Sequence, residues 1–475
     1  MQYVVENNYL KSLVLYFIQT KYFTDCIPFK QIFMSMHPKV SVFWFRRDLR
    51  LDDNHALYLA LSSGYPVVAV FLFDRDILDK LESKTDKRVN LIYDKLLELN
   101  KILAKAGSFL FTYNGFAKDM FSDLSGKFEI HSVFANEDYE PYAVKRDNEV
   151  RIFLKVNGIS FVTVKDQVIY RYNEVLKPSD GSCYTIFTPY CRKWKERYNM
   201  ESHQKFSSET LLRHLYKTNQ GVFPSLDSIG FVKREYFLSD MNISDEILTH
   251  YEAGRNNPAL DATSHVSVSL RFGFVSIREL VKLAFAKSEI WLNELIWREF
   301  FMQILANFPY VKTEPFKKQY DRIIWRNDEK EFECWKNGQT GFPIVDAGLR
   351  QLNTTGYMHN RVRMITASFL VKHLLIDWRW GEAYFAEKLM DFDLAANNGN
   401  WQWTAGCGCD AVPYFRIFNP VLQQQKFDPD FAYSLRWVPE LNTLAYPAKI
   451  IDMNEAKARC MRVYKEALEQ ERSGR

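Results

Sequence analysis

Short apolar runs alternate with helical segments through the first third of the chain, and this alternation restricts the fold more than any other feature. VSVFWF (40–45) precedes a charged loop and a helical segment that stops at Gly64. PVVAVFLF (66–73) precedes an amphipathic segment over 88–107, and SFLFTY, SVFAN and FVTV continue the series. Buried strands that alternate with helices predict a doubly wound, five-stranded parallel sheet with helices on both faces.

The same patterns divide the rest of the chain. The α/β sheet domain is expected over 39–168, and no GxGxxG follows its first strand to mark a dinucleotide site. Pro, Gly and Ser are frequent over 169–230, which predicts a connector with some structure of its own. Over 231–475 strand patterns nearly vanish, so we predict a larger all-α domain. Its clearest helical patterns cover 291–308, 343–356, 360–378 and 381–393.

Residues 1–38 form a separate extension. They are apolar and dotted with lysines but lack a small-residue cleavage site, so we do not expect a secretory signal. A targeting segment and an upstream start, with Met34 or Met36 as the true beginning, are both open interpretations. No apolar run reaches 18 residues, and seven cysteines without regular spacing are typical of a reducing compartment. We therefore expect a cytoplasmic protein.

Aromatic side chains are concentrated in the helical half. They make up 16% of the residues, and nine of the 11 tryptophans follow residue 290. This enrichment predicts a stacking surface or a cofactor cavity, with a large aromatic core as the alternative. The net charge of +4 permits a polyanionic partner without requiring one. Cys407 and Cys409 have no second ligand pair nearby, so we expect two buried, inert thiols and no metal site.

WLNELIWREFF (291–301) carries the first candidate site. On a helix, Trp291, Glu294 and Arg298 share one face, and Trp297 lies beside it. A carboxylate buried between tryptophans needs a partner. One interpretation is a surface pair between Glu294 and Arg298 over core tryptophans. The other is a pocket in which Glu294 hydrogen-bonds a flat polar ligand.

Two later segments also mix polar and small residues. One helical face of MHNRVRMITASF carries amide, guanidinium and thioether groups on Asn360, Arg363, Met364 and Ala367. This mixture favours a polar ligand, although an exposed face with a gap-filling methionine is an alternative. DFDLAANNGNWQW adds Asp391, Asp393 and Asn397 beside small residues that let a ligand approach the backbone. No Ser/His/Asp set or HExxH accompanies them, which argues against a hydrolase.

Together these segments closely resemble the DNA photolyase/cryptochrome family. The resemblance rests on FWFRRDLRLDDN, WLNELIWREFF, GFPIVDAGLRQLNTTGYMHNRVRMITASFLVK, and LAANNGNWQW through DAVPYFRIFNP, and it covers nearly everything from Val40 onward. Within the family, the chain is most similar to class I cyclobutane pyrimidine dimer photolyases. The resemblance implies an α/β domain, a connector, and a helical domain that holds FAD in a U-shaped conformation.

The resemblance also implies which residues contact the flavin. These are Tyr251, Thr263, Ser264, Ser267, Trp291, Glu294, Arg298, Asn360, Arg363, Asp391, Asp393 and Asn397. By similarity, Asn397 lies at the N5 edge of the flavin, where an amide favours the neutral one-electron-reduced state. Asp391 and Asp393 would act near the other polar edge of the flavin and at Arg363.

The substrate pocket and the charged contacts follow from the same resemblance. Trp297 and Trp403 would form two walls against which a flipped-out dimer stacks. Glu294 would hydrogen-bond the pyrimidine edge with help from Asn360, and Met364 would pack against the dimer. The related enzymes for (6-4) photoproducts usually carry a histidine at the methionine position, and a thioether cannot transfer a proton. Backbone phosphate contacts are expected from Arg255, Arg298, Arg361 and Arg416, and electron relay from Trp401, Trp378 and Trp325.

The implied function is light-driven repair of cyclobutane pyrimidine dimers. Reduced FAD (FADH⁻) absorbs light, passes one electron to the dimer, and recovers it after both carbon–carbon bonds break. We expect a monomer that binds UV-damaged DNA and, in a bacterial cell, is associated with the nucleoid. The alternative is a cryptochrome-like blue-light photoreceptor, against which Asn397, Met364 and Trp403 form the repair-type set.

Two segments leave questions open. The family's usual TSRLSP phosphate segment reads TSHVSV here, with His265 in place of arginine and Val268 in place of proline. NEDYEPYAVKRD (136–147) resembles the region beside the family's second chromophore. Methenyltetrahydrofolate and 8-hydroxy-5-deazaflavin are both possible antennas on this basis.

Overall fold

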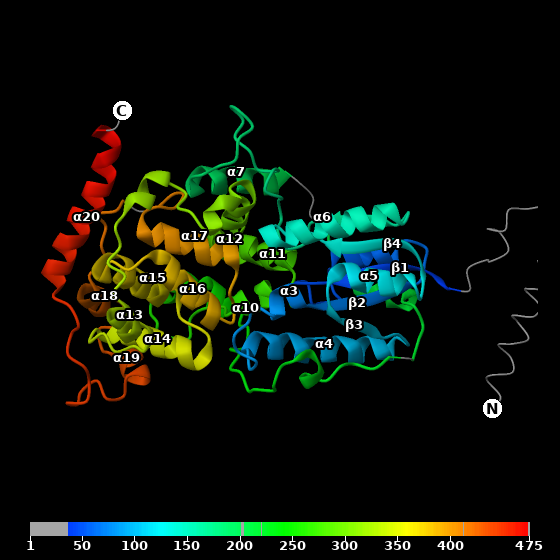
Figure 1. The fold of residues 1–475 in the computed structure, drawn as a ribbon, viewed down its shortest axis with the longest axis horizontal. Coiled ribbons are helices and arrows are strands. Elements are labelled where there is room, and N and C mark those ends of the chain that lie inside the picture. The colour runs from blue at the N-terminus through cyan, green and yellow to red at the C-terminus, as the bar shows by residue number, and fades with distance from the viewer. Residues whose placement is uncertain (1–36, 201–203, 220, 412, 474–475) are drawn as a thin grey trace, which may run out of the picture.

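A computed structural model describes residues 37–200, 204–219, 221–411 and 413–473. The extension expected over 1–38 therefore lies outside the described residues, except for His37 and Pro38. Figure 1 shows the sheet domain, in blue and cyan, beside a helical body coloured from green to red. Within the described ranges, the structure contains no helix with the length and apolar character needed to span a lipid bilayer.

The sheet has the predicted parallel topology. Its strand order is β3-β2-β1-β4-β5, and all four pairings are parallel. In the centre, Phe43 lies opposite Ala69 on one side and Phe134 on the other. The strands are β1 (Lys39–Phe45), β2 (Val67–Asp74), β3 (Leu110–Gly115), β4 (Glu129–Asn136) and β5 (Ser160–Val164). Each predicted apolar run thus forms a strand.

Helices cover both faces of the sheet. Because side chains alternate along a strand, Val42 and Trp44 pack beneath α5 and α6, while Phe43 and Phe45 pack beneath α2 and α4. The two layers explain why β1 is apolar at nearly every position. The helices of this domain are α2 (His55–Leu61), α3 (Arg75–Leu78), α4 (Lys87–Lys105), α5 (Ala117–Ser125) and α6 (Pro141–Val156).

The connector has structure of its own, as the sequence predicted. It contains α7 (Phe187–Met200) and the 3₁₀ turns η2 (Ser208–His214) and η3 (Asp227–Ile229). The segment after η2 returns to the sheet, where the Tyr216 N–H donates to the Val67 carbonyl at 2.8 Å.

The remainder is helical, and no strand occurs among its described residues. Two apolar clusters form its core, one around α12 and α7 and the other around α14 to α17 and α20. The helices are α8 (Asp245–Thr249), α9 (Tyr251–Gly254), α10 (Ser267–Arg271), α11 (Ile277–Lys287), α12 (Glu289–Asn307), α13 (Glu329–Lys336), α14 (Pro343–Thr355), α15 (Asn360–Ser368), α16 (Trp378–Lys388), α17 (Leu394–Ala405), α18 (Pro420–Phe427), α19 (Ala432–Trp437) and α20 (Met453–Ser473), with the 3₁₀ turns η4 (Pro309–Lys312) and η5 (Lys318–Arg322).

The prediction of one continuous helix over 360–378 is wrong. A π-helical turn, η6 (Phe369–Leu374), follows α15, and Leu375 adopts a left-handed conformation with φ of 53°. Asp377 then caps a new helix by accepting from the Arg379 N–H at 3.0 Å. The predicted helix over 381–393 likewise starts earlier and ends at Lys388. Periodicity alone could not locate these breaks because the apolar pattern continues through them.

The segment that the sequence left unassigned, Leu394–Ala405, forms α17. Asp393 caps its start by accepting from the Ala396 N–H at 3.2 Å, and Gly406 ends it with φ of 90°. Gly399 is required within the helix, because a Cβ there would lie 2.2 Å from the Phe301 ring of α12. The missing side chain therefore lets α17 and α12 approach closely.

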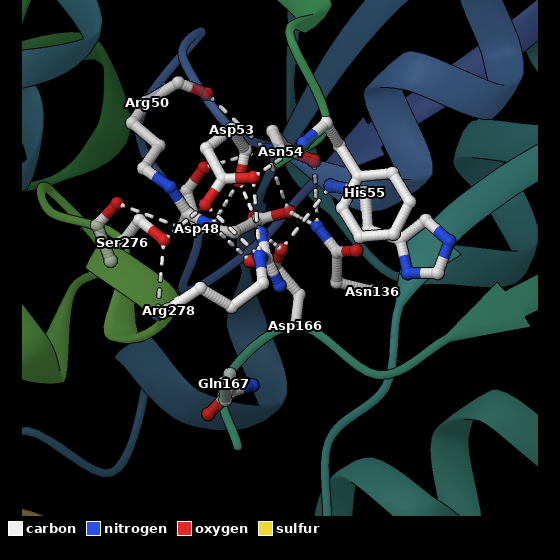
Figure 2. Close-up of polar contacts among 12 residues, drawn as sticks. Asp48, Arg50, Asp53, Asn54, His55, Asn136, Asp166, Gln167, Ser276 and Arg278 are labelled. Atoms are coloured by element: carbon white, nitrogen blue, oxygen red, sulfur yellow. Dashed lines mark hydrogen bonds and ion pairs between the residues drawn. The ribbon is translucent and has the colours of Figure 1, made fainter. Parts of the chain in front are cut away.

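A buried polar network joins the two domains (Figure 2). Arg278 of α11 donates to Asp53 at 3.0 Å and to Asp166 at 2.8 Å, and Arg50 donates to Asp166 at 2.6 Å. Both carboxylates are fully buried. Burial opposes ionisation of Asp166, but the two guanidinium groups hold its pKa below the usual value. Removing one partner from such a pair typically costs about 3–5 kcal/mol, so this network fixes the domains against each other.

Candidate active site

Two adjoining cavities lie among α9, α10, α12, α15 and α17. They measure about 480 and 100 Å³ and share Asn360, Arg363, Met364 and Asn400 as walls, so they form one site. The large cavity is lined by Tyr251, Thr263, Ser264, Ser267, Trp291, Glu294, Arg298, Asn360, Arg363, Asp391 and Asp393, and the small one includes Asn397. Every residue predicted to contact the flavin therefore lies in the cavity wall. Large, mixed aromatic and polar cavities are the usual form of cofactor sites.

Helix α12 contributes one wall. Trp291 is buried and its indole N–H donates to Ser264 Oγ at 3.1 Å. Glu294 pairs with Arg255, the residue that directly follows α9, with 2.7 Å between Oε1 and Nη1. Arg298 instead donates to the main-chain carbonyl of Gln167 at 2.7 Å. The Glu294–Arg298 surface pair, one of the two interpretations of this helix, is therefore not formed.

The segment with the unusual TSHVSV sequence lines the large cavity with hydroxyls and a helix start. Thr263, Ser264 and Ser267 lie in the wall, and Ser267 begins α10. His265 has φ of 50° and pairs with Asp261, with 2.5 Å between Nε2 and Oδ1. Val268 is buried with Leu91, Phe272 and Met390. The two departures from the family pattern thus have local partners, and Thr263, Ser264 and Ser267 all keep their place in the cavity wall.

The two aspartates of DFD have different partners. Asp391 accepts a bidentate pair from Arg363, at 3.2 and 2.8 Å, as the resemblance implied. Asp393 instead accepts from Arg47 at 2.6 Å and from the Tyr139 hydroxyl at 2.8 Å, both from the α/β domain. Burial opposes ionisation of Asp393, but nearby arginines hold its pKa well below the usual range. The α/β domain therefore reaches the wall of the cavity.

Asn397 is held in one orientation by a residue that the sequence did not single out. Its amide nitrogen donates to both the main-chain oxygen of Glu382, at 3.0 Å, and the Glu382 carboxylate, at 2.8 Å. Both amide hydrogens are thereby used, and the carbonyl oxygen is left as the group that can accept a bond from a ligand. Burial raises the pKa of Glu382, which the bond from Asn397 partly offsets.

Comparisons with known proteins agree with this geometry. Residues 41–208 match the family model described as DNA photolyase, and residues 291–445 match the FAD binding domain of DNA photolyase. A deoxyribodipyrimidine photo-lyase from Vibrio cholerae is 36% identical over 89% of this chain and 99% of its own length. The chain belongs to the DNA photolyase family.

Two solved photolyase structures share its architecture. A bacterial class III photolyase from Agrobacterium tumefaciens is 31% identical, with a TM-score of 0.79 over 92% of this chain and 99% of its own. An archaeal photolyase from Sulfolobus tokodaii, solved with two FAD molecules, is 33% identical, with a TM-score of 0.73 over 90% and 99%. The assignment to class I, made from the sequence, stays a prediction.

The residues predicted to hold the dimer line the same photolyase cavity. Trp297, Trp403, Glu294, Asn360 and Met364 are all in the wall of the large cavity. The Trp297 ring is stacked on Phe187 of α7, with centroids 3.6 Å apart and planes inclined by 6°. The connector therefore supports this wall, a contact that no pattern in the sequence predicted.

Three of the four predicted DNA arginines form a cationic cluster. Arg255 lines the large cavity, and Arg361 donates to Asn256 Oδ1 at 2.6 Å. Burial, followed by the positive charges of Arg255 and Arg416, lowers the pKa of Arg361. Such a cluster suits a phosphate backbone. Arg298, the fourth, is in the cavity wall with a main-chain partner.

The predicted relay tryptophans are not all joined by ring contacts. Trp401 lines the small cavity and is buried against Phe385 at 5.0 Å and Trp335 at 6.2 Å between centroids. Among the described residues, neither Trp378, which is buried, nor Trp325 makes a ring contact with Trp401. The order of the relay stays a prediction.

A separate cavity lies beside the segment that resembles the antenna region. It measures about 490 Å³ and lies between α6 and the end of α12. Its walls are Tyr139, Pro141, Val144, Lys145, Asn148, Glu149, Ile152, Leu305, Ala306 and Pro309. Four of these walls fall within 136–147, and Asn148 and Glu149 directly follow that segment. Whether an antenna binds there stays a prediction.

Proposed function

We propose that this protein repairs cyclobutane pyrimidine dimers in DNA with light, using FAD held in the large and small cavities. The proposal rests on one observation, which is that the predicted residues lie together in the structure. Residues taken from α9, α10, α12, α15 and α17, and predicted separately for flavin and dimer, meet around one continuous space. A merely aromatic core would have no reason to place arginines, hydroxyls and amides around an opening.

The chain's own residues would bind and orient the lesion. Trp297 and Trp403 offer flat rings on which a flipped-out dimer can stack, and base–aromatic stacking contributes about 1–3 kcal/mol per base. Glu294 would hydrogen-bond the pyrimidine edge while Arg255 holds its carboxylate in place. Met364 would pack against the dimer as an apolar surface with no proton to transfer.

The bound cofactor would supply the electron. The chemistry that it would supply, when reduced and excited by blue light, is transfer of one electron to the dimer and return of that electron once both cyclobutane bonds have broken, with no net oxidation. The bonds to Glu382 would hold the Asn397 carbonyl oxygen toward the bound cofactor. Arg255, Arg361 and Arg416 would hold the DNA backbone without reading its sequence.

The repair activity is tested with purified protein, reduced FAD and two oligonucleotides. One carries a thymine cyclobutane dimer and the other a (6-4) photoproduct. We expect blue light to remove the first lesion only, with no loss of either in the dark. Failure to remove the cyclobutane dimer in the light would reject the proposal, and removal of the (6-4) lesion would reject the role given to Met364.

Three further features belong to the same proposal. We propose that the protein acts as a monomer. Binding to damaged DNA would associate the protein with the nucleoid of a bacterial cell. The cavity beside α6 is the proposed site of a second chromophore, and an absorption spectrum of the purified protein would distinguish a folate from a deazaflavin there.

A further inference from the structure

Arg47 belongs to the α/β domain but is bonded to the wall of the flavin cavity. It lies two residues after the end of β1, and its side chain is only 10% exposed. One guanidinium nitrogen donates to Asp393 at 2.6 Å, and the other donates to Glu140 at 2.6 Å. The planar guanidinium therefore bridges a carboxylate of its own domain and a carboxylate of the helical domain.

Asp393 connects Arg47 to the start of α17. Its side chain lines both cavities and also caps the helix through the Ala396 N–H. One turn later the helix carries Asn397, whose N–H donates to the Asp393 carbonyl at 2.8 Å, and the next turn carries Trp401. The position of one carboxylate thus sets the start of the helix that presents the proposed flavin-side residues.

We propose that Arg47 is a positioning residue for the flavin site, through which the α/β domain sets the start of α17. This inference rests on the proposed function, since it requires that the cavity holds FAD. Arg47 does not line either cavity, and it contacts the cavity wall directly at Asp393. The α/β domain then has a part in shaping the flavin site, in addition to any part in holding a second chromophore.

The charges around Arg47 are balanced within a small volume. Arg47, Arg271 and Arg298 face Asp138, Glu140 and Asp393, three cations against three anions. Loss of Arg47 alone would leave one excess negative charge at the wall of the cavity. We therefore expect the change to alter the spectrum and the reduction potential of bound flavin as well as its affinity.

The network of Figure 2 provides a matched control. Arg278 is also a largely buried arginine that joins the two domains through carboxylates, but neither it nor Asp53 nor Asp166 lines the flavin cavities. A purely structural role of inter-domain ion pairs predicts that Arg278→Met and Arg47→Met act alike. Positioning through Asp393 predicts that only the change at Arg47 reaches the flavin.

The experiment compares full-length wild type with Arg47→Met, Arg47→Lys, Tyr139→Phe and Arg278→Met. FAD bound per polypeptide, FAD affinity, the visible spectrum, the flavin midpoint potential and the thermal midpoint are measured for each. We expect Arg47→Met to weaken FAD binding by about tenfold, within the range common for coupled sites. Arg47→Lys should retain an intermediate affinity, because a single ammonium cannot bridge both carboxylates in the same way.

The gentler variant keeps the test valid if Arg47→Met fails to fold. Tyr139→Phe removes only the hydroxyl that donates to Asp393 and leaves the charges unchanged, so we expect a smaller spectral change with a loss of about threefold. Arg278→Met should lower the thermal midpoint while the affinity and spectrum of FAD stay as in wild type. Wild-type affinity in Arg47→Met or Tyr139→Phe, or an equal flavin loss in Arg278→Met, would overturn the inference. A wild-type protein that binds no FAD would overturn the proposed function itself.

Discussion

Glu382 offers the sharpest test of how the protein orients a group toward the flavin. The Asn397 amide donates one hydrogen to the Glu382 main chain and the other to its carboxylate. Replacing Glu382 by leucine removes the second acceptor and leaves the first. The amide is then free to turn, and its carbonyl oxygen no longer faces the cavity in every molecule. An N5–H of reduced flavin would lose part of its acceptor.

The magnitude follows from the single bond that is removed. A hydrogen bond to a charged group contributes about 1.5–3 kcal/mol. For a one-electron couple, a tenfold change in equilibrium is 59 mV, so the full bond corresponds to about 65–130 mV. Because the main-chain bond at 3.0 Å remains, we expect the lower end of this range, a shift of about 60 mV toward more negative potential.

A charge effect must be separated from this bond. Removing a carboxylate near the flavin raises its potential, which opposes the expected shift. Glu382→Gln provides the control, since it also lacks the charge but keeps an oxygen that can accept from Asn397. The bond that Gln retains is neutral and contributes about 0.5–1.5 kcal/mol, so spectroelectrochemical titration should place Glu382→Leu about 20–65 mV below Glu382→Gln. Indistinguishable potentials in the two variants would refute the orientation argument.

Three other substitutions test separate parts of the molecule. Glu294→Ala should retain flavin but lower repair per absorbed photon and weaken dimer binding by about tenfold, and an unchanged yield would remove Glu294 from the pocket. Trp401→Phe should slow photoreduction of oxidised flavin in flash photolysis yet leave repair near normal after chemical reduction; normal photoreduction would exclude it from the relay. Burial lowers the pKa of Lys372 from 10.5 to about 8, so stability should rise with pH between those values as the unfolded chain alone binds the proton. In urea titrations, Lys372→Met should abolish that rise. It should also raise the free energy of unfolding by about 2 kcal/mol at pH 7, because the buried charge is removed. The Ala405 carbonyl loses its bond from Lys372 but keeps the one from the Tyr464 hydroxyl.

The sheet could be predicted because each strand is defined by its own residues. VSVFWF and VVAVFLF are buried on both faces, and Asn54 and Gly107 punctuate the helices that follow. These are local causes, visible without knowledge of the fold. Helix boundaries in the C-terminal half were harder, because η6 and Leu375 interrupt a sequence whose apolar pattern is continuous.

The residues of the site also fall into a group that could be predicted from the sequence and a group that could not. All the residues that the resemblance named for the flavin and the dimer line the cavities, and all of them belong to motifs that can be read in the sequence. The resemblance did not indicate Glu382, Arg47 or Phe187, which support the wall from other elements. Their contacts join segments that are far apart in the chain, and a single sequence carries no information on such pairing. Arg47 was visible only as part of the charged loop after β1.

The helical conformation of Leu394–Ala405 explains how WQW can serve two purposes. Residues two apart on a helix point about 200° away from each other around its axis, whereas on a strand they would share a face. Trp401 is therefore buried against α16, where Gly381 makes room because a Cβ would lie 2.1 Å from its ring. Trp403 instead lines the large cavity. Under the proposed function, Trp401 would exchange electrons with the flavin and Trp403 would receive the lesion, and the helical conformation is what directs the two rings to different sides.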